Sequence, residues 1–156
     1  MDYIQLENKI INVLDKTLFC VLATANSDGV VCATQMCLVN DGLKVFIQTD
    51  KNFEKVKNIK ENKNVAINCG AYYFKGVASI KGHPTENKIF IDKIKNKHLQ
   101  TYKNYTNLPN EILIEIYLTE CKIWGAGNEE DVHNQETILT VDLINKKIEK
   151  VICDKL

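Results

Sequence analysis

LKVFIQTDKNFEKVKNIKENKNVAI, residues 43–67, is the stretch of this chain that decides its fold. Its first seven residues are mostly apolar, which is typical of a buried strand. The lysine-rich part that follows, residues 52–62, has the pattern of a short amphipathic helix. Strand residues return at Asn64. We therefore expect a strand, a short helix and a second strand.

The same stretch carries a candidate anion site. The first strand ends in Gln48 and Thr49, and the helical part offers Lys51, Lys55 and Lys57. Phosphate oxygens accept hydrogen bonds from hydroxyl and ammonium groups, and the N-terminus of a helix adds positive potential. A phosphate-bearing ligand is the functional hypothesis. An ordinary solvated amphipathic helix is the alternative.

The composition limits the class of protein. A chain of 156 residues, 45% hydrophobic and 26% charged, fits one globular domain over residues 1–156. Its 20 acidic and 20 basic residues cancel, so no general attraction to nucleic acid or to an anionic membrane is expected. The N-terminus lacks the pattern of a signal peptide, and no apolar run approaches the ~20 residues that cross a bilayer. We expect a cytoplasmic protein without nucleic-acid or membrane partners.

The kinds of basic and sulfur residues limit the chemistry further. All 20 basic residues are lysine, so a phosphate must be held by ammonium groups, hydroxyls and backbone amides rather than by a guanidinium. The six cysteines form no CxxC pair and no Cys/His cluster with zinc spacing. We expect reduced thiols that pack as small hydrophobes, and no metal site.

The rest of the chain predicts many short strands and a few helices. Helices are expected over residues 2–16 and from Thr85 to about residue 102. Strands are expected over residues 17–25, 30–39, 43–49, 64–73, 75–83 and 112–125. A final hairpin turns at Asn145 and Lys146. The first three strands, joined by two tight turns, are expected to form an antiparallel meander.

Short strands with tight turns indicate a mainly β (α+β) fold, a small closed or nearly closed antiparallel barrel of about six or seven strands with three flanking helices. A barrel this small fills its interior with side chains. A sizeable ligand would then lie outside the barrel or between two subunits. We expect a homodimer, with the apolar strand at residues 112–118 as candidate interface surface.

The order of the elements is specific enough to suggest a family. An N-terminal helix leads into LATANSDGVV, then ATQMCLVNDGLKVFIQT, then a K-x-K helix and ENKNVAI. This order resembles the pyridoxamine 5′-phosphate oxidase-like superfamily of FMN-binding split β-barrels, above all its small stress-protein-like and nitroimidazole-resistance-like members. The likeness covers nearly the whole chain and is clearest over residues 17–83. It implies an antiparallel split β-barrel with flanking helices that binds FMN as a homodimer.

The resemblance also implies which residues lie along the flavin. In that family the second strand runs beside the cofactor, and the matching residues are Thr34, Gln35, Met36 and Cys37. Gln35 would offer amide hydrogen bonds to the ring edge, or else face solvent, while Met36 and Cys37 are expected to pack. Trp124 resembles a family tryptophan near the flavin, with core packing as its alternative.

At the phosphate end, the resemblance implies that Gln48 and Thr49 face the ribityl-phosphate and that Lys55 binds the phosphate. The family often carries Ser-Arg just before this lysine, where the present chain has Phe-Glu. That departure weakens the phosphate site as the family usually builds it. Lys51 or Lys57 would have to compensate.

The expected activity follows from a second departure. True pyridoxamine phosphate oxidases follow the tryptophan with an Arg-Leu-His-x-Arg run, whereas KIWGAGNEEDVHN keeps Trp124 and His133 but has no arginine to grip a substrate phosphate. We expect an FMN-dependent oxidoreductase that passes electrons between a nicotinamide nucleotide, NADH or NADPH, and a small acceptor. The alternatives are a non-catalytic flavin-binding stress or regulatory protein, and a split barrel that binds haem. No catalytic residue stands out.

Overall fold

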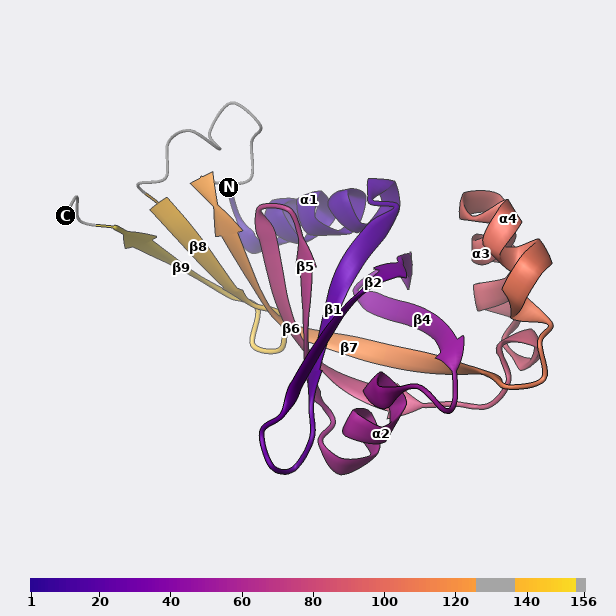
Figure 1. Ribbon diagram of the computed structural model, residues 1–156. Helices are drawn as coiled ribbons and strands as arrows, with labels where there is room; N and C mark the ends of the chain where they lie inside the picture. The colour runs from indigo at the N-terminus through magenta and orange to yellow at the C-terminus, as the bar shows by residue number, and fades with distance from the viewer. Residues whose placement is uncertain (126–136, 154–156) are drawn as a thin grey trace.

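The computed structural model describes residues 1–125 and 137–153 (Figure 1). Its helices are α1 (Tyr3–Lys16), α2 (Glu54–Glu61), α3 (Lys88–Lys97) and α4 (Leu99–Thr101), with a 3₁₀ turn at Pro84–Glu86 and a π-helical turn at Tyr102–Thr106. Its strands are β1 (Phe19–Ala25), β2 (Val31–Cys37), β3 (Val39–Asp41), β4 (Lys44–Asp50), β5 (Asn64–Cys69), β6 (Tyr72–Ile80), β7 (Glu111–Trp124), β8 (Thr137–Asp142) and β9 (Lys147–Ile152). None of the described helices is long and apolar enough to cross a membrane.

The nine strands form one antiparallel sheet. Its order is β2-β1-β5-β6-β7-β4-β3, and β8 and β9 extend it from the far end of β7. The sheet curls around the core as a half-barrel, with α2 below it and α3 and α4 on the side of β4 (Figure 1). The predicted fold, a mainly β antiparallel split barrel with flanking helices, is confirmed.

The predicted meander is wrong, because the strand expected at 30–39 is interrupted at Leu38. The Leu38 side chain is fully buried, and its N–H donates to the Leu18 carbonyl at 2.9 Å. That bond still follows the β1–β2 register, in which Cys37 pairs with Phe19, and β2 ends at Cys37. From Val39 on, the chain belongs to the other edge of the sheet, where β3 pairs with β4 as the second predicted hairpin and β4 pairs with β7 instead of with β2. The sheet also exceeds the expected six or seven strands, since this strand divides and the C-terminal hairpin joins the sheet.

The first helix forms because its sequence provides a cap and an apolar stripe. Asp2 accepts from the N–H of Gln5 at 2.8 Å while the Gln5 side chain accepts from the N–H of Asp2, which makes a capping box. Leu6, Ile10 and Leu14 recur at helical spacing and are buried in the barrel core. α1 thus contributes to the core from outside the sheet.

The segment after β6 differs from the single helix expected from Thr85. Thr85 lies in the 3₁₀ turn, and α3 starts after Asn87, whose side chain accepts from the N–H of Phe90 at 2.9 Å. Phe90 packs against Phe46 of β4, with ring centroids 6.1 Å apart. This contact places α3, and the turns that follow it, beside the end of β4.

The long strand β7 lies inside the fold rather than on a free surface. Leu113, Ile114, Ile116 and Leu118 are buried in it, and Tyr117 is the exposed large side chain of the stretch. Most side chains of residues 112–118 therefore fill the core between β4 and β6, and the surface that this stretch could offer to an interface is reduced to Tyr117. Its part in a homodimer stays a prediction.

Candidate functional site

A polar cavity of about 380 Å³ opens where β2, the end of β4 and the first turn of α2 meet. Seven of the residues singled out from the sequence line it: Thr34, Gln35, Met36, Cys37, Gln48, Thr49 and Lys55. The strand break at Leu38 lets the chain pass from β2, at one edge of the sheet, to β3 and β4 at the other edge. Because the sheet curls, β2 and β4 then lie close to each other. The structure brings the two halves of the predicted site together.

Lys55 is the cation of this cavity. Only 7% of the residue is exposed, and its ammonium lies 4.9 Å from the centre of the Phe53 ring. Within the described residues it has no hydrogen bond and no ion pair. Burial lowers the pKa of Lys55, against the opposing effects of Cys32, Glu111 and Glu54. A buried cation without an ion pair is costly, so the cavity is suited to an anion that would pair with it.

Two neighbouring side chains at the end of β4 can add hydrogen bonds. Thr49 is 4% exposed, and its hydroxyl has no partner within the described residues. The Gln48 carbonyl oxygen accepts from the Thr106 hydroxyl at 2.7 Å, which fixes the amide and leaves its two N–H groups for the cavity. A hydroxyl, an amide and an ammonium therefore line one cavity.

The position of Lys55 depends on how α2 docks. Val56 and Ile59 bury the apolar side of this eight-residue helix, and the Asn58 amide donates to the Thr24 hydroxyl of β1 at 3.1 Å. Lys55 sits in the first turn, at the N-terminus of the helix. The helix therefore adds positive potential at the same place as the ammonium.

Other sequence candidates lie elsewhere. Lys51 is exposed in the turn before α2, and Lys57 is exposed on the solvent side of that helix. Trp124 ends the 14-residue strand β7, whose other end, Glu111, reaches the cavity, and so within one chain it does not line the site. His133 and the acidic loop around it are outside the described residues.

The cavity also includes residues that the sequence did not single out. Asp50 and Glu111 face each other in the β4–β7 pairing, while Thr101 and Tyr105 come from the turns after α3. Phe53 completes the set beside Lys55. Asp50 and Phe53 lie within two residues of predicted ones, but the other three reach the cavity through long-range contacts of the fold that no local pattern reveals.

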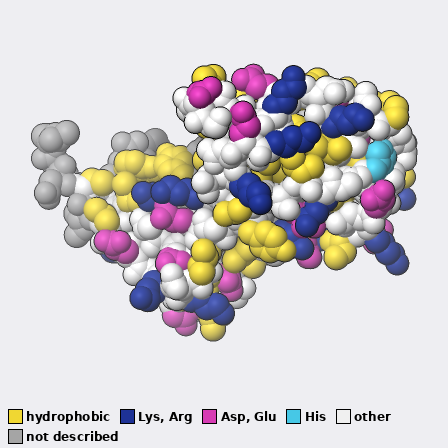
Figure 2. Space-filling view, turned by 90° about the horizontal axis from the view of Figure 1, so that it is seen from below, with side chains coloured by type: hydrophobic (Ala, Val, Ile, Leu, Met, Phe, Trp, Pro, Cys, Tyr) yellow, Lys and Arg dark blue, Asp and Glu magenta, His cyan; other side chains and the backbone are white. Residues whose placement is uncertain are grey.

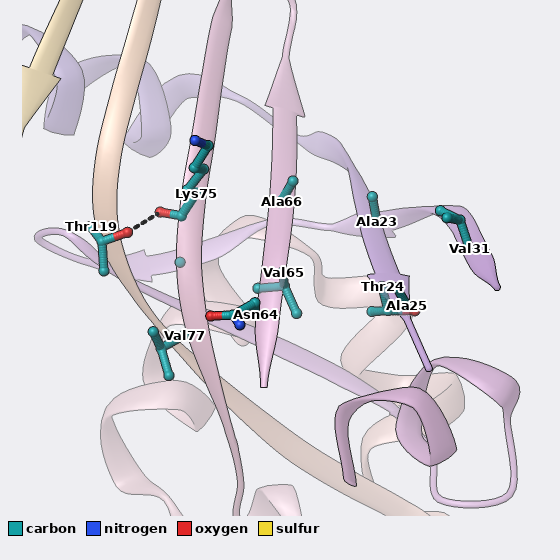
Figure 3. A pocket seen from close by; sticks show the side chains of 11 residues that line it. Ala23, Thr24, Ala25, Val31, Asn64, Val65, Ala66, Lys75, Val77 and Thr119 are labelled. Atoms are coloured by element: carbon teal, nitrogen blue, oxygen red, sulfur yellow. Dashed lines mark hydrogen bonds between the residues drawn. The ribbon is translucent and has the colours of Figure 1, made fainter. Parts of the chain in front are cut away.

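A second groove, of about 410 Å³, lies across β1, β5 and β6 and shares no residue with the polar cavity (Figure 3). Small apolar side chains such as Ala23, Ala66 and Val77 line most of it. The Thr119 hydroxyl donates to the Lys75 carbonyl at 3.2 Å, so this hydroxyl is already used. The groove therefore offers mainly apolar surface, to which Asn64 and Lys75 add polar side chains.

Comparison with known proteins agrees with this architecture. The model of the pyridoxamine 5′-phosphate oxidase family matches residues 6–125. The chain belongs to this family. General stress protein 26 of Bacillus subtilis (strain 168) is 26% identical over 138 residues, which are 85% of this chain and 97% of that protein.

Two solved structures share the fold at low sequence identity. ChuZ of Campylobacter jejuni has a TM-score of 0.74 at 15% identity, over 100% of this chain and 68% of that one. HutZ, the haem storage protein of Vibrio cholerae, has a TM-score of 0.60 at 16% identity, over 76% of this chain and 91% of that one. The fold of this family member is therefore found in proteins with different names and roles.

Proposed function

We propose that this family member binds FMN in the polar cavity, with the phosphate at Lys55 and Thr49 and the ring along β2. The observation that carries the proposal is the ammonium of Lys55, buried in a cavity without a hydrogen bond or ion pair within the described residues. A phosphate carries close to two negative charges at neutral pH and accepts several hydrogen bonds, so it matches this cation and the nearby hydroxyl.

The residues along β2 fit a flat ring system. Thr34, Met36 and Cys37 give this wall a mixed, partly apolar character, and Gln35 adds an amide at its exposed edge. Tyr105, in the π-helical turn after α4, also lines the cavity. Apolar surface along one wall, with polar groups at fixed places, is typical of small-molecule sites.

The proposed activity is that of an FMN-dependent oxidoreductase between a nicotinamide nucleotide and a small acceptor. Bound flavin supplies the hydride and electron chemistry, so the protein needs to bind, orient and shield it. The cavity residues fit this role, because Lys55 and Thr49 would hold one end while the Gln48 amide, fixed by Thr106, would contact the middle.

Oxidation of pyridoxamine phosphate is not proposed for this chain. That reaction requires the substrate phosphate to be held so that its carbon meets the flavin, and orientation of this kind accounts for several kcal/mol of the barrier. The chain contains no arginine, and lysines cannot make the same bidentate contact. FMN-loaded protein is expected to form no useful amount of pyridoxal phosphate.

Two other functions would use the same fold. A flavin-binding stress protein without turnover agrees with the likeness to general stress protein 26. A haem protein agrees with the likeness to HutZ, but His83 and His98 both use ring nitrogens on internal carbonyls, at 2.8 Å and 3.2 Å. Neither of these two described histidines lines the cavity, so the part of the cavity that the structure describes supplies no histidine ligand for haem.

We also propose a homodimer, because a single chain would cover the flavin ring on the β2 side only. The exposed Gln35 lies at the cavity mouth and is paired across the sheet with Val21, which is 40% exposed on the outer face. A second copy against this outer face would therefore reach the cavity and complete it.

The test is FMN binding by wild type and Lys55→Ala. A hydrogen bond to a charged group contributes roughly 1.5–3 kcal/mol, so the variant should bind FMN about tenfold to a hundredfold more weakly. Riboflavin, which has no phosphate, should bind both proteins equally. Lys57→Ala removes an exposed lysine from the same helix and is the matched control, expected to leave FMN affinity unchanged.

The spectrum and turnover of the purified protein separate the functions. A flavin spectrum with oxidation of a nicotinamide nucleotide in the presence of a chemical acceptor supports the oxidoreductase. A flavin spectrum without turnover supports the stress or regulatory protein, and a Soret band supports haem. Unchanged FMN affinity in Lys55→Ala would contradict the proposed phosphate position.

A further inference from the structure

The phosphate end of the cavity contains an acidic side as well as Lys55. Glu111, the first residue of β7, lines the cavity and is 8% exposed. Asp50 faces it in the β4–β7 register and also lines the cavity. A phosphate bound at Lys55 would therefore lie near two carboxyl groups, one of them largely removed from water.

The charged groups around Glu111 come from three other segments of the chain. Burial, and then the charge of Asp50 on β4, raise the pKa of Glu111; His83 before the 3₁₀ turn and Lys55 on α2 oppose this more weakly. Within the described residues the Glu111 carboxyl has no hydrogen bond or ion pair. The His83 ring is occupied, since its Nε2 donates to the Leu108 carbonyl and its Nδ1 accepts from the Thr85 hydroxyl.

We propose that Glu111 is a residue of the phosphate site that acts in its protonated form, so that the phosphate binds together with a proton at Glu111. The neutral carboxyl would donate its O–H to a phosphate oxygen, whereas the carboxylate can only accept and would repel the phosphate. The proposal rests on the proposed function, since it requires a phosphate-bearing ligand at Lys55.

The direction of the pH dependence follows from this arrangement. Below the raised pKa of Glu111 the carboxyl is a hydrogen-bond donor and FMN binds well. As the pH rises through that pKa, above the ordinary 4.5, the carboxylate forms and the affinity falls. The second ionisation of the ligand phosphate, near pH 6, affects any FMN site and must be separated from this effect.

Glu111→Gln separates the two effects, because glutamine keeps an N–H donor of nearly the same shape and cannot ionise. FMN affinity is measured from about pH 5 to about pH 8, where the phosphate effect is common to both proteins. We expect wild type to lose about tenfold more affinity across this range than the variant, which is the effect of one unfavourable charge. Glu120→Gln, on the same strand but outside the cavity, is the matched control and should follow wild type.

Proton uptake gives a second, independent measurement. Calorimetric titration near neutral pH in buffers of different ionisation enthalpy should show that FMN binding takes up more protons in wild type than in Glu111→Gln. Riboflavin binding should show no difference between the two proteins. FMN binding with equal pH profiles and equal proton uptake would overturn the role of Glu111 and leave the proposed function standing. If wild type binds FMN at no pH, both fall.

Discussion

Thr49 tests the phosphate site at the scale of one hydroxyl. Thr49→Val keeps the shape of the side chain and removes one neutral hydrogen bond, worth about 0.5–1.5 kcal/mol net. FMN affinity in a titration should therefore fall by about two- to tenfold, less than in Lys55→Ala. Thr17→Val, which removes a hydroxyl at the end of α1, away from both the cavity and the groove, is the control. A loss as large as that in Lys55→Ala would mean that packing at Thr49, not its hydroxyl, matters.

The buried ammonium of Lys55 should lower the stability of the ligand-free protein, although it would help the protein to bind a phosphate. Because its pKa is lowered by burial, the unfolded chain holds this proton more tightly, and stability should rise with pH from the lowered pKa up to 10.5. Lys55→Met removes the buried charge. It should raise the free energy of unfolding at neutral pH by on the order of 1 kcal/mol and flatten the alkaline rise.

Denaturation of the ligand-free proteins at several pH values measures this effect. Lys57→Met, at an exposed position of the same helix, should leave both the stability and its pH dependence unchanged. A less stable Lys55→Met protein would show that the ammonium gains more from its surroundings in the folded chain than burial costs it.

At the scale of the element, α2 must be docked correctly for Lys55 to reach the cavity. Asn58→Ala leaves the Thr24 hydroxyl, 2% exposed, without the Asn58 donor and should cost about 1–3 kcal/mol of stability. FMN affinity of the folded variant should also fall, because the helix can shift. Lys60→Ala, on the exposed side, is the control. Lower stability with unchanged affinity would show that the position of Lys55 does not depend on this bond.

Local patterns predicted most elements but not all of their pairings. The turn at 26–29 and the lysine helix follow from residue type and spacing, and both are present. The break at Leu38 could not be predicted, because residues 30–39 form one apolar run. It arises from tertiary contacts, namely the burial of Leu38 and the pairing of β4 with the much later β7.

The candidate site divides in the same way. Gln48, Thr49 and Lys55 are near one another in sequence, so their grouping was predictable from the strand–helix order. Glu111 joins them only through the β4–β7 register, which puts it opposite Asp50. A single acidic residue at the start of an apolar strand carries no local sign of that position.

At the scale of the whole molecule, one outer face of the sheet exposes apolar side chains. Val31 is 67% exposed, Val77 40% and Tyr117 56%, and Val77 pairs directly with Tyr117 across β6 and β7. Apolar side chains gather between lysines on the face seen from below (Figure 2). The groove of Figure 3 runs over β1, β5 and β6 between these residues and would receive side chains of a second copy.

Val77→Glu tests whether this face holds the proposed homodimer together. A buried carboxylate on each side of an isologous interface would lack a partner and repel its copy, so the variant should be monomeric at micromolar concentration in light scattering, whereas wild type should show twice the 17.8 kDa chain mass. FMN affinity should fall with the loss of the dimer, since Gln35 links this face to the cavity. Ile144→Glu, at a residue 68% exposed between β8 and β9, adds the same charge elsewhere and should stay dimeric. A monomeric wild type would contradict the proposal, and a dimeric Val77→Glu protein would move the interface to another face.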